Sequence, residues 1–318
     1  MKDFRNTFVV VLITLATSLT VSGQRKITFT PQWTAQSQFA GYYAAEELGY
    51  YDEAGLDVTI VHPSTSNSAI NRLKDGTSDF VTMQMQQAMI EIDKGHKVIN
   101  ILQTMQNTSL QIMPRHEDIT SLDDLKGKRV GIWKVGFGDY ALMADKERNL
   151  KIEWIPFVQN INLFISGVID ATLATSYNEL LQIKAAGYNI SAAIPMADEG
   201  YNFPEDGLYV SEVLFRKEPE TVKAFTEASR KGWEWVERHP DEALEIVMKQ
   251  VMENHVATNR AHQKWMLEEV IRLNIDMQTG TATYSLRPEQ VKALNDLMIR
   301  HKLITRTISP ETLTGKRP

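Results

Sequence analysis

The feature that most constrains the fold is an alternation of short strand-like and helix-like segments along the first two thirds of the chain. Segments 27–30, 56–61, 80–83 and 98–102 are rich in β-branched or apolar residues, and helix-like segments separate them. The same rhythm continues between residues 122 and 194. This alternation predicts parallel sheets with helices on both faces.

The pattern changes after residue 210, where few strand-like segments remain. Apolar residues that recur with the 3.6-residue period predict long amphipathic helices at residues 219–238, 241–253, 260–273 and 288–301. A stretch with so few strands cannot form an α/β lobe of its own. We therefore expect these helices to pack back onto an earlier sheet.

These patterns predict an α/β protein with two doubly wound lobes, in which the chain leaves the first lobe and later returns to it. Lobe 1 comprises residues 24–111 and 211–318, and lobe 2 comprises residues 112–210. The crossings are expected near residues 111–116 and 208–211. Ligands of open parallel sheets bind beyond the carboxyl ends of the strands, so two facing lobes predict a ligand cleft between them.

Residues 1–23 have the pattern of a cleavable export signal. Lys2 and Arg5 precede an apolar run, and small residues up to Gly23 suit cleavage before Gln24. A retained membrane anchor is the alternative, but the strongly apolar part is short and is diluted by Ser and Thr. We expect a periplasmic protein whose mature chain is not stably inserted in a membrane.

The composition argues against several classes of function. The chain carries 40 acidic and 34 basic residues, and this acidic balance disfavours nucleic acid as a partner. The absence of cysteine excludes disulfides, thiolate metal sites, cysteine nucleophiles and a lipid-bearing N-terminal cysteine. The histidines form no H-E-x-x-H motif, and no G-x-S-x-G or Walker motif occurs. We expect a monomer with no metal, cofactor or catalytic residue.

Two aromatic loops supply the first candidate ligand-binding residues. Trp33 lies in a polar loop after the first strand, and Tyr177 lies in the loop after the predicted strand 171–174. Each ring can stack on a flat ligand from its own lobe, and Glu179 can accept hydrogen bonds from ring N–H or amine groups. Asn178, between Tyr177 and Glu179, is a ligand-binding candidate as well. The alternatives are that Trp33 caps the core and that Asn178 caps a helix beginning at Glu179.

Polar loops after two other strands supply further candidates. Ser64, Ser66 and Asn67 precede a predicted helix, where backbone N–H groups favour an anion or a polar ligand head. Ordinary helix capping accounts for each of them as well. Gln84 and Gln86 follow the strand 80–83 and are expected to face either a polar cavity or solvent, because buried unpaired amides are costly.

A glycine-containing loop follows the predicted strand 129–133. Gly136, Phe137 and Gly138 lie in a nominal G-x-G-x-x-A dinucleotide fingerprint. The required acidic residue falls near Glu153, within a predicted strand, so we favour a nest of backbone N–H groups or an open loop that admits a ligand.

Several spaced motifs carry a resemblance to a known family. They are residues 26–29 leading to Trp33, 49–58, 79–80, 121–131 and 167–171. In this order they resemble the sulfonate and thiamine-pyrimidine-precursor group of solute-binding proteins, the SsuA-like group, from about Lys26 to Ala243. The resemblance implies a type II periplasmic binding fold, whose lobes close on a small-molecule ligand and present it to an ABC permease and its ATPase.

The resemblance also implies roles for single residues. The pyrimidine-binding branch of the group stacks its ring between aromatic side chains, and Trp33 and Tyr177 stand at the matching positions. Glu179 matches a ring-recognising carboxylate, and residues 136–138 match a loop that holds a phosphate in relatives with phosphate ligands. The implied ligand is a small planar heterocycle, a precursor of the thiamine pyrimidine.

Two alternatives remain beside this function. The first is a module that senses the ligand for a membrane signalling partner. The second is an enzyme like the fungal thiamine-pyrimidine synthase of the same superfamily, which consumes its own histidine and holds pyridoxal phosphate on a lysine. The matching positions are Phe39, which we keep as a ligand-binding candidate, and Met83, and the synthase's cysteine-rich iron motif has no counterpart. These departures disfavour an enzyme.

Overall fold

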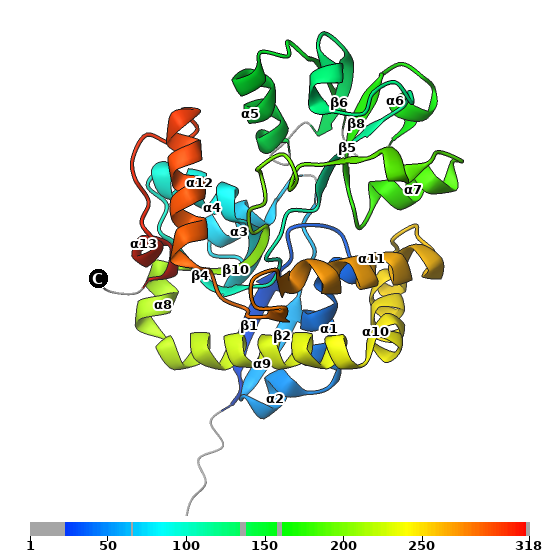
Figure 1. Cartoon of the computed structure of the whole chain (residues 1–318). Helices are drawn as coiled ribbons and strands as arrows, with labels where there is room; N and C mark the ends of the chain where they lie inside the picture. Colours follow the sequence, from blue (N-terminus) through cyan, green and yellow to red (C-terminus); the bar gives the residue numbers. More distant parts are fainter. Residues whose placement is uncertain (1–22, 65, 134–137, 158–160, 316–318) are drawn as a thin grey trace, which may run out of the picture.

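The fold is described from a computed structural model, in which residues 23–64, 66–133, 138–157 and 161–315 are described. The export signal predicted for residues 1–23 lies outside these ranges, except for Gly23. Two five-stranded sheets form the centres of two lobes, which Figure 1 shows one above the other.

The first sheet has the strand order β2-β1-β3-β10-β4. Strand β1 pairs in parallel with both β2 and β3, whereas β10 is antiparallel to β3 and β4. The strands are β1 (Arg25–Thr30), β2 (Leu56–Ile60), β3 (Phe80–Gln84), β4 (Val98–Gln103) and β10 (Asp206–Ser211).

The second sheet has the order β7-β6-β8-β5-β9. Strand β6 pairs in parallel with β7 and β8, and β5 is antiparallel to β8 and β9. The strands are β5 (Leu110–Pro114), β6 (Arg129–Trp133), β7 (Glu153–Phe157), β8 (Ala171–Thr175) and β9 (Ile194–Pro195).

Both sheets are mixed, whereas the sequence pattern predicted parallel sheets. Most of the strands point their carboxyl ends toward the other lobe, and a chain that arrives from that lobe must run the opposite way. The segments predicted as crossings, 111–116 and 208–211, lie largely within the arriving strands β5 and β10. The chain therefore changes sheets between β4 and β5 and again between β9 and β10. The lobe boundaries at 111/112 and 210/211 remain a prediction.

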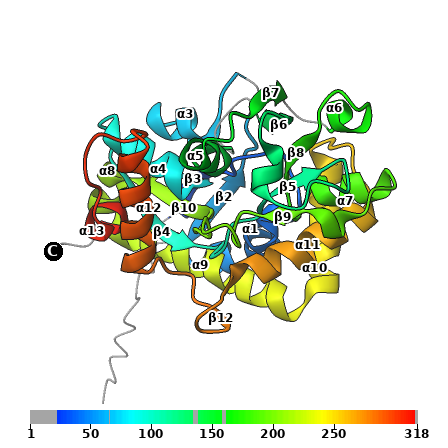
Figure 2. The same ribbon diagram turned by 45° about the horizontal axis from the view of Figure 1, so that its top comes forward.

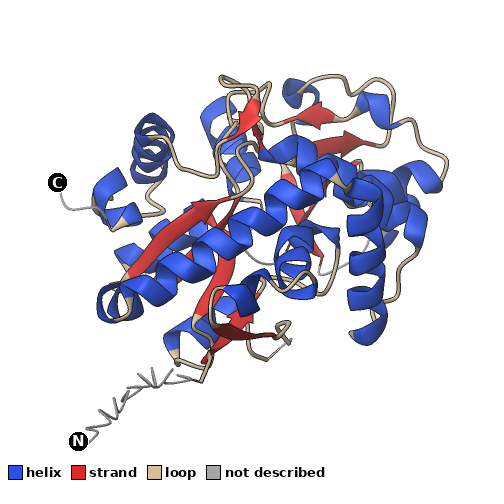
Figure 3. Ribbon diagram, turned by 90° about the horizontal axis from the view of Figure 1, so that it is seen from below, coloured by secondary structure: helices blue, strands red, loops and turns tan. Residues whose placement is uncertain are grey.

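Helices pack around the sheets (Figure 3), and the helices of the last third of the chain lie beside the first sheet (Figure 1). Helices α8, α9 and α13 contact strands of the first sheet, and α12 contacts α4. The predicted long helices are all present. The helices of this lobe are α1 (Ala40–Glu47), α2 (Tyr50–Glu53), α3 (Ala69–Lys74), α4 (Met85–Asp93), α8 (Glu212–Lys217), α9 (Pro219–Arg238), α10 (Pro240–Glu253), α11 (Arg260–Asn274), α12 (Pro288–Arg300) and α13 (Pro310–Thr314).

The second lobe carries shorter helices. They are α5 (Asp139–Arg148), α6 (Asn162–Ile165) and α7 (Glu179–Ala185). Helix α7 lies beside α11 of the first lobe in the views of Figures 1 and 2. Among the described residues, no helix combines the length and the apolar character needed to cross a membrane.

Helices α1 and α9 cross closely beneath the first sheet because glycines stand at the crossing. A Cβ on Gly232 would lie 2.0 Å from the backbone oxygen of Gly41, and a Cβ on Gly41 would lie 2.2 Å from the ring of Trp233. The Trp233 ring is fully buried there. This packing anchors α1 and so the loop that connects β1 to it, which carries Trp33.

Candidate functional site

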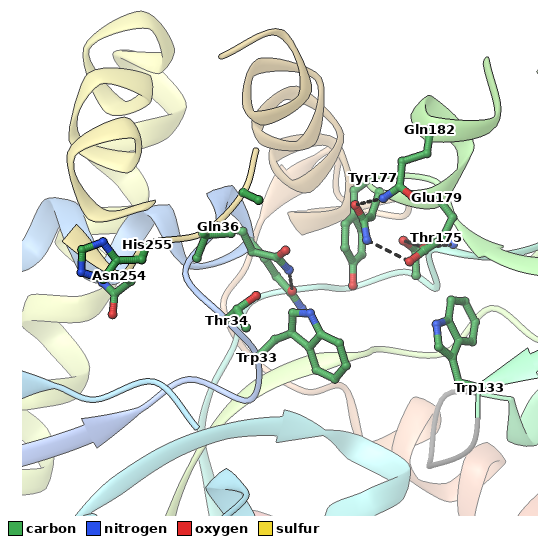
Figure 4. A pocket seen from close by; sticks show the side chains of 14 residues that line it. Trp33, Thr34, Gln36, Trp133, Thr175, Tyr177, Glu179, Gln182, Asn254 and His255 are labelled. Atoms are coloured by element: carbon green, nitrogen blue, oxygen red, sulfur yellow. Dashed lines mark hydrogen bonds between the residues drawn. The ribbon is translucent and has the colours of Figure 1, made fainter. Parts of the chain in front are cut away.

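A cavity of about 430 Å³ lies between the carboxyl ends of strands from the two sheets (Figure 4). Four described segments form its walls: the loop after β1, the end of β6, the end of β8 with the start of α7, and the connection between α10 and α11. The lining residues are Trp33, Thr34, Gln36, Gln38, Trp133, Thr175, Tyr177, Asn178, Glu179, Gln182, Asn254, His255, Val256 and Ala257.

Three aromatic side chains from both lobes line this cavity. Trp33 follows β1 in the first lobe, whereas Trp133 ends β6 and Tyr177 follows β8 in the second. Figure 4 shows the Trp33 ring between the two lobes, with Tyr177 and Trp133 on the opposite side. The Trp133 ring also packs against Phe157, with ring centroids 5.4 Å apart. A flat ligand in this space therefore meets aromatic faces from both sheets.

Glu179 is the only described acidic residue in the cavity wall, and its carboxylate is held by three donors. The backbone N–H and the hydroxyl of Thr175 donate to Oε2 at 2.9 and 2.7 Å, and Asn178 Nδ2 donates to Oε1 at 2.8 Å. Burial raises the pKa of Glu179, and these hydrogen bonds oppose that rise. Each carboxylate oxygen can accept two hydrogen bonds, so Oε1 retains a place for a ligand donor.

The segment that carries Glu179 is tied to the first lobe by α11. His262 Nε2 lies 2.8 Å from Asn178 Oδ1, and Trp265 Nε1 donates to the backbone oxygen of Ser176 at 2.9 Å. Burial lowers the pKa of His262. Because Asn178 Nδ2 donates to Glu179, its Oδ1 is the acceptor and the His262 ring nitrogen carries the hydrogen. Asn178 precedes α7, as predicted, but its side chain does not cap the helix.

Behind the cavity, on the side of the first lobe, three amide side chains meet a buried carboxylate. Gln36 Nε2 donates to Gln38 Oε1, and Gln38 Nε2 donates to Asp206 Oδ2 at 2.5 Å. Gln32 Nε2 donates to Asp206 Oδ1 at 2.6 Å. Burial raises the pKa of Asp206 to about 6, and the two amide donors oppose the rise. A carboxylate can only accept, so Asp206 determines which end of the Gln38 amide faces it.

A second carboxyl group, Glu205, precedes Asp206 in the chain but accepts hydrogen bonds from the segment between β4 and β5. The Thr108 hydroxyl and the Ser109 backbone N–H donate to Oε1, and the Ser109 hydroxyl donates to Oε2 at 2.7 Å. Burial raises the pKa of Glu205 to about 7. Glu205, which directly precedes β10, thus links the chain that returns to the first lobe with the chain that leaves it between β4 and β5.

The structure brings together four of the residues singled out in the sequence. Trp33, Tyr177, Asn178 and Glu179 line one cavity, although they come from two sheets and are separated by more than a hundred residues. Their role in binding remains a prediction.

The remaining candidates lie elsewhere or outside the description. Phe39 is buried in the core of the first lobe, and Ser64 and Ser66 are exposed, hydrogen-bonded to each other, with Asn67 half-buried beside them. The helix cap at α3 is made by Ser68. None of these lines the cavity. Gly136 and Phe137 lie outside the described residues.

Gln84, Gln86 and Gly138 also do not line the cavity. Gln86 Nε2 donates to Gln84 Oε1, and the Tyr140 hydroxyl donates to Gln86 Oε1 at 3.4 Å, so these amides face neither solvent nor the cavity. Gly138 precedes α5, where a Cβ would lie 2.4 Å from the Ile132 side chain. Close packing accounts for the glycine at this position.

Sequence reasoning missed several lining residues. Trp133 carried the same signal as Trp33, an aromatic residue at the carboxyl end of a strand, and could have been found. Gln36 and Gln38 lay within a loop that was recognised, but nothing distinguished them there. Residues 254–257 connect two helices, and only the packing of α10 and α11 brings them to the cavity.

The described part of the cavity wall carries few ionisable groups. Among the described lining residues there is no Lys or Arg, while Glu179 and His255 are the ionisable groups apart from Tyr177. No group of three or more His, Cys, Asp or Glu is placed to hold a metal ion in the described part of the chain. The described wall offers aromatic faces, the carboxylate of Glu179 as an acceptor, and amide and hydroxyl groups that can donate or accept.

Comparisons with known proteins agree on one family. A family model described as NMT1/THI5 like matches residues 36–243. The riboflavin-binding protein RibY of Chloroflexus aurantiacus is 23% identical over 256 residues, which cover 77% of this chain and 72% of that protein. The formylaminopyrimidine-binding protein of Halalkalibacterium halodurans is 25% identical over 224 residues, 68% of each chain.

Solved structures share the fold at lower sequence identity. The periplasmic aliphatic sulphonate binding protein SsuA from Escherichia coli superposes with a TM-score of 0.67 and 12% identity, over 91% of each chain. This likeness establishes a two-lobed periplasmic binding protein fold. It says nothing by itself about the ligand.

Proposed function

The chain belongs to the NMT1/THI5-like family, and from this membership we propose that it is the periplasmic ligand-binding component of an ABC importer. Its lobes close on a small molecule and present it to a permease and an ATPase. The family membership and the two-lobed fold with a cavity between the lobes support this assignment. A ligand that contacts both lobes favours the closed state, because it binds that state more tightly than the open one.

The proposed ligand is a small planar heterocycle of the pyrimidine type that carries N–H donors. The observation behind this proposal is the shared cavity, where Trp33, Trp133 and Tyr177 offer aromatic faces beside the carboxylate of Glu179. Stacking suits a flat ring, and the acceptor suits an exocyclic amine or a ring N–H. The described wall has no Lys or Arg, which disfavours a sulfonate or phosphate ligand.

The names of the relatives support the same class of ligand and add a second probe. One relative is named for formylaminopyrimidine and the other for riboflavin, and both of these ligands contain a pyrimidine ring. The cavity of about 430 Å³ exceeds what one pyrimidine ring fills, so a larger ring system also fits by volume. An enzyme of the synthase type is not supported, because both Phe39 and Met83 are buried apolar residues.

Titration calorimetry tests the proposal, with 4-amino-5-hydroxymethyl-2-methylpyrimidine and riboflavin as probes. The wild-type protein is expected to bind at least one of them. Trp33→Ala and Tyr177→Leu should each weaken that binding about tenfold to a hundredfold, because each removes one stacking face. The leucine keeps an apolar side chain at position 177, which is buried.

The control replaces a tryptophan outside the cavity. Trp235 on α9 stacks on His239, which follows the helix, and does not line the cavity, so Trp235→Phe should bind like the wild type. Wild-type protein that binds neither probe would remove the pyrimidine assignment. Unchanged affinity in both cavity variants would refute the stacking geometry.

A further inference from the structure

The hydrogen-bond polarity of the first-lobe wall is determined outside the cavity, at Asp206. The carboxylate accepts the Gln38 amide nitrogen at 2.5 Å, which turns Gln38 Oε1 toward Gln36. That oxygen accepts the Gln36 amide nitrogen, and the Gln36 carbonyl oxygen is left as the outward end of the chain of amides. Gln36 lines the cavity, and Figure 4 shows its side chain extending toward the space between Trp33 and Tyr177.

We propose that Asp206 is a positioning residue that makes Gln36 present a hydrogen-bond acceptor at the first-lobe wall, so that the site selects rings presenting an amino N–H over rings presenting a carbonyl at Gln36. This inference rests on the proposed function and adds to it the donor pattern of the ligand. Asp206 itself does not line the cavity; it acts through Gln38 and Gln36.

The orientation of the Gln36 and Gln38 amides resists reversal because the Asp206 carboxylate can accept a hydrogen bond but cannot donate one. If the Gln36 amide turned over, its oxygen would face the Gln38 oxygen. If Gln38 turned over to relieve this, its oxygen would face the Asp206 carboxylate. Either mismatch leaves buried polar groups unpaired, and Gln36, Gln38 and Asp206 are all buried. A ligand carbonyl placed against the Gln36 oxygen therefore meets an acceptor, and turning the Gln36 amide over to present its nitrogen there unpairs buried groups.

The second-lobe wall also offers a hydrogen-bond acceptor, and different residues hold it in place. Asn178 Nδ2 donates to Glu179 Oε1, and the Asn178 amide is held in this orientation by His262 and by Gln182 Nε2 at 3.1 Å. Glu179 then presents carboxylate oxygen to the cavity. Both lobes thus offer acceptors, which matches a ring with N–H donors on two edges.

The test compares two rings of the same shape with opposite donor and acceptor edges. The probes are 4-amino-5-hydroxymethyl-2-methylpyrimidine and its 4-oxo counterpart, and calorimetry gives the ratio of their dissociation constants. The wild-type protein should prefer the amino ring roughly tenfold or more, as expected for an unpaired buried acceptor. Asp206→Ala should bring the ratio close to one, because Gln38 and Gln36 can then turn over.

Two further variants separate positioning from a merely structural effect. Glu205→Ala removes the neighbouring buried carboxyl group, which contacts Thr108 and Ser109 and not the amide chain, so the preference should be kept. Gln38→Glu should also keep it, because a carboxyl group shared with Asp206 can donate to it and still accept from Gln36. If Asp206→Ala does not fold, Gln38→Leu breaks the same chain and should abolish the preference.

The outcomes distinguish this inference from the function on which it rests. A wild-type protein that binds neither ring contradicts the proposed function and this specificity together. A wild-type preference that persists in folded Asp206→Ala and in Gln38→Leu contradicts the role of Asp206 alone. Equal loss in Glu205→Ala would mean that the acidic pair acts only on the general fold.

Discussion

Glu205 and Asp206 are adjacent carboxyl groups, both buried where the chain returns from the second sheet to the first. Each has donors around it, and each still has its pKa raised by burial, to about 7 and about 6 respectively. A charge at such a place is retained at a cost in stability. The structure gives each group a use: Glu205 ties together the two crossings, and Asp206 orients the amides behind the cavity.

Glu205→Gln tests the cost of this burial through the pH dependence of stability. The pKa of Glu205 is higher in the folded chain than in the unfolded chain, so its contribution to stability is largest below about pH 4.5 and is lost as the pH rises toward about 7. The glutamine of the variant does not titrate, so the variant does not lose this stability as the pH rises. Relative to wild type, Glu205→Gln should therefore become more stable with rising pH, by at most about 1.4 kcal/mol per pH unit.

Urea unfolding at pH 5 and pH 7, followed by tryptophan fluorescence, measures the difference. We compare the change in the free energy of unfolding between pH 5 and pH 7 in the two proteins. The constant cost of replacing a carboxylate that accepts three hydrogen bonds cancels in this comparison. A variant whose stability runs parallel to wild type at both pH values would show that Glu205 titrates as it does in the unfolded chain.

Aromatic residues that line the cavity were readable from the sequence because a large ring at a strand exit is unusual in an otherwise polar stretch. Trp33 and Tyr177 were identified in this way, and Trp133 carried the same signal. Gln36 and Gln38 could not be singled out, since their importance comes from Asp206, which lies 168 residues away from Gln38. No local pattern records such a partner.

Helices α7 and α11 form a bridge between the lobes beside the cavity. His262 contacts Asn178, Trp265 contacts Ser176, and Lys184 lies over the Trp265 ring at 5.3 Å from its centroid. This bridge fixes the start of α7, where Tyr177 and Glu179 face the cavity. Its residues are distant in sequence and no periodic pattern marks them.

His262→Ala should weaken binding of the aminopyrimidine probe about tenfold, because Asn178 loses one of the two donors that orient its amide toward Glu179 and keeps only the longer bond from Gln182. His262→Gln keeps a donor on a flexible side chain and should recover much of the loss. Calorimetry gives the affinities, and thermal unfolding shows whether the fold is kept. Full affinity in folded His262→Ala would mean that Glu179 needs no support from the first lobe.

The elements themselves were predicted unevenly, for a physical reason. The long helices α9 to α12 carry a strong apolar period over many turns and were recovered with their boundaries. The sequence pattern predicts crossings at the interior strands β5 and β10, because a strand buried on both faces lacks the alternation of a half-exposed one. Whether such an apolar segment forms a strand or a connection depends on whether strands of a sheet pair with it, and those strands are distant in the sequence.

Ligand binding should bring the two lobes closer together, and the absence of cysteine makes this simple to measure. Met252 on α10 is 65% exposed, and Val168 after α6 is 45% exposed. Spin labels on Met252→Cys and Val168→Cys should report a shorter or narrower distance distribution when the aminopyrimidine probe is added. A ligand that touches both lobes shifts the population toward the closed state.

A pair within one lobe provides the control for this measurement. Val213 on α8 is 61% exposed and belongs to the same lobe as Met252. Labels on Met252→Cys and Val213→Cys should give the same distances with and without the probe. An interlobe distance that stays unchanged at saturating probe would contradict closure.

The alternation of segments, the amphipathic periods and the aromatic loops are local properties, and these were enough to predict two α/β lobes with a ligand cleft between them. Strand direction, the position of the crossings and the membership of the cavity depend on contacts between distant residues. Trp33 and Glu179 become neighbours of one cavity through the packing of two sheets, and the Gln36 amide takes its orientation from a carboxylate on a returning strand. Such pairings are created when the chain folds, because burial and hydrogen bonding act between groups that are far apart along it.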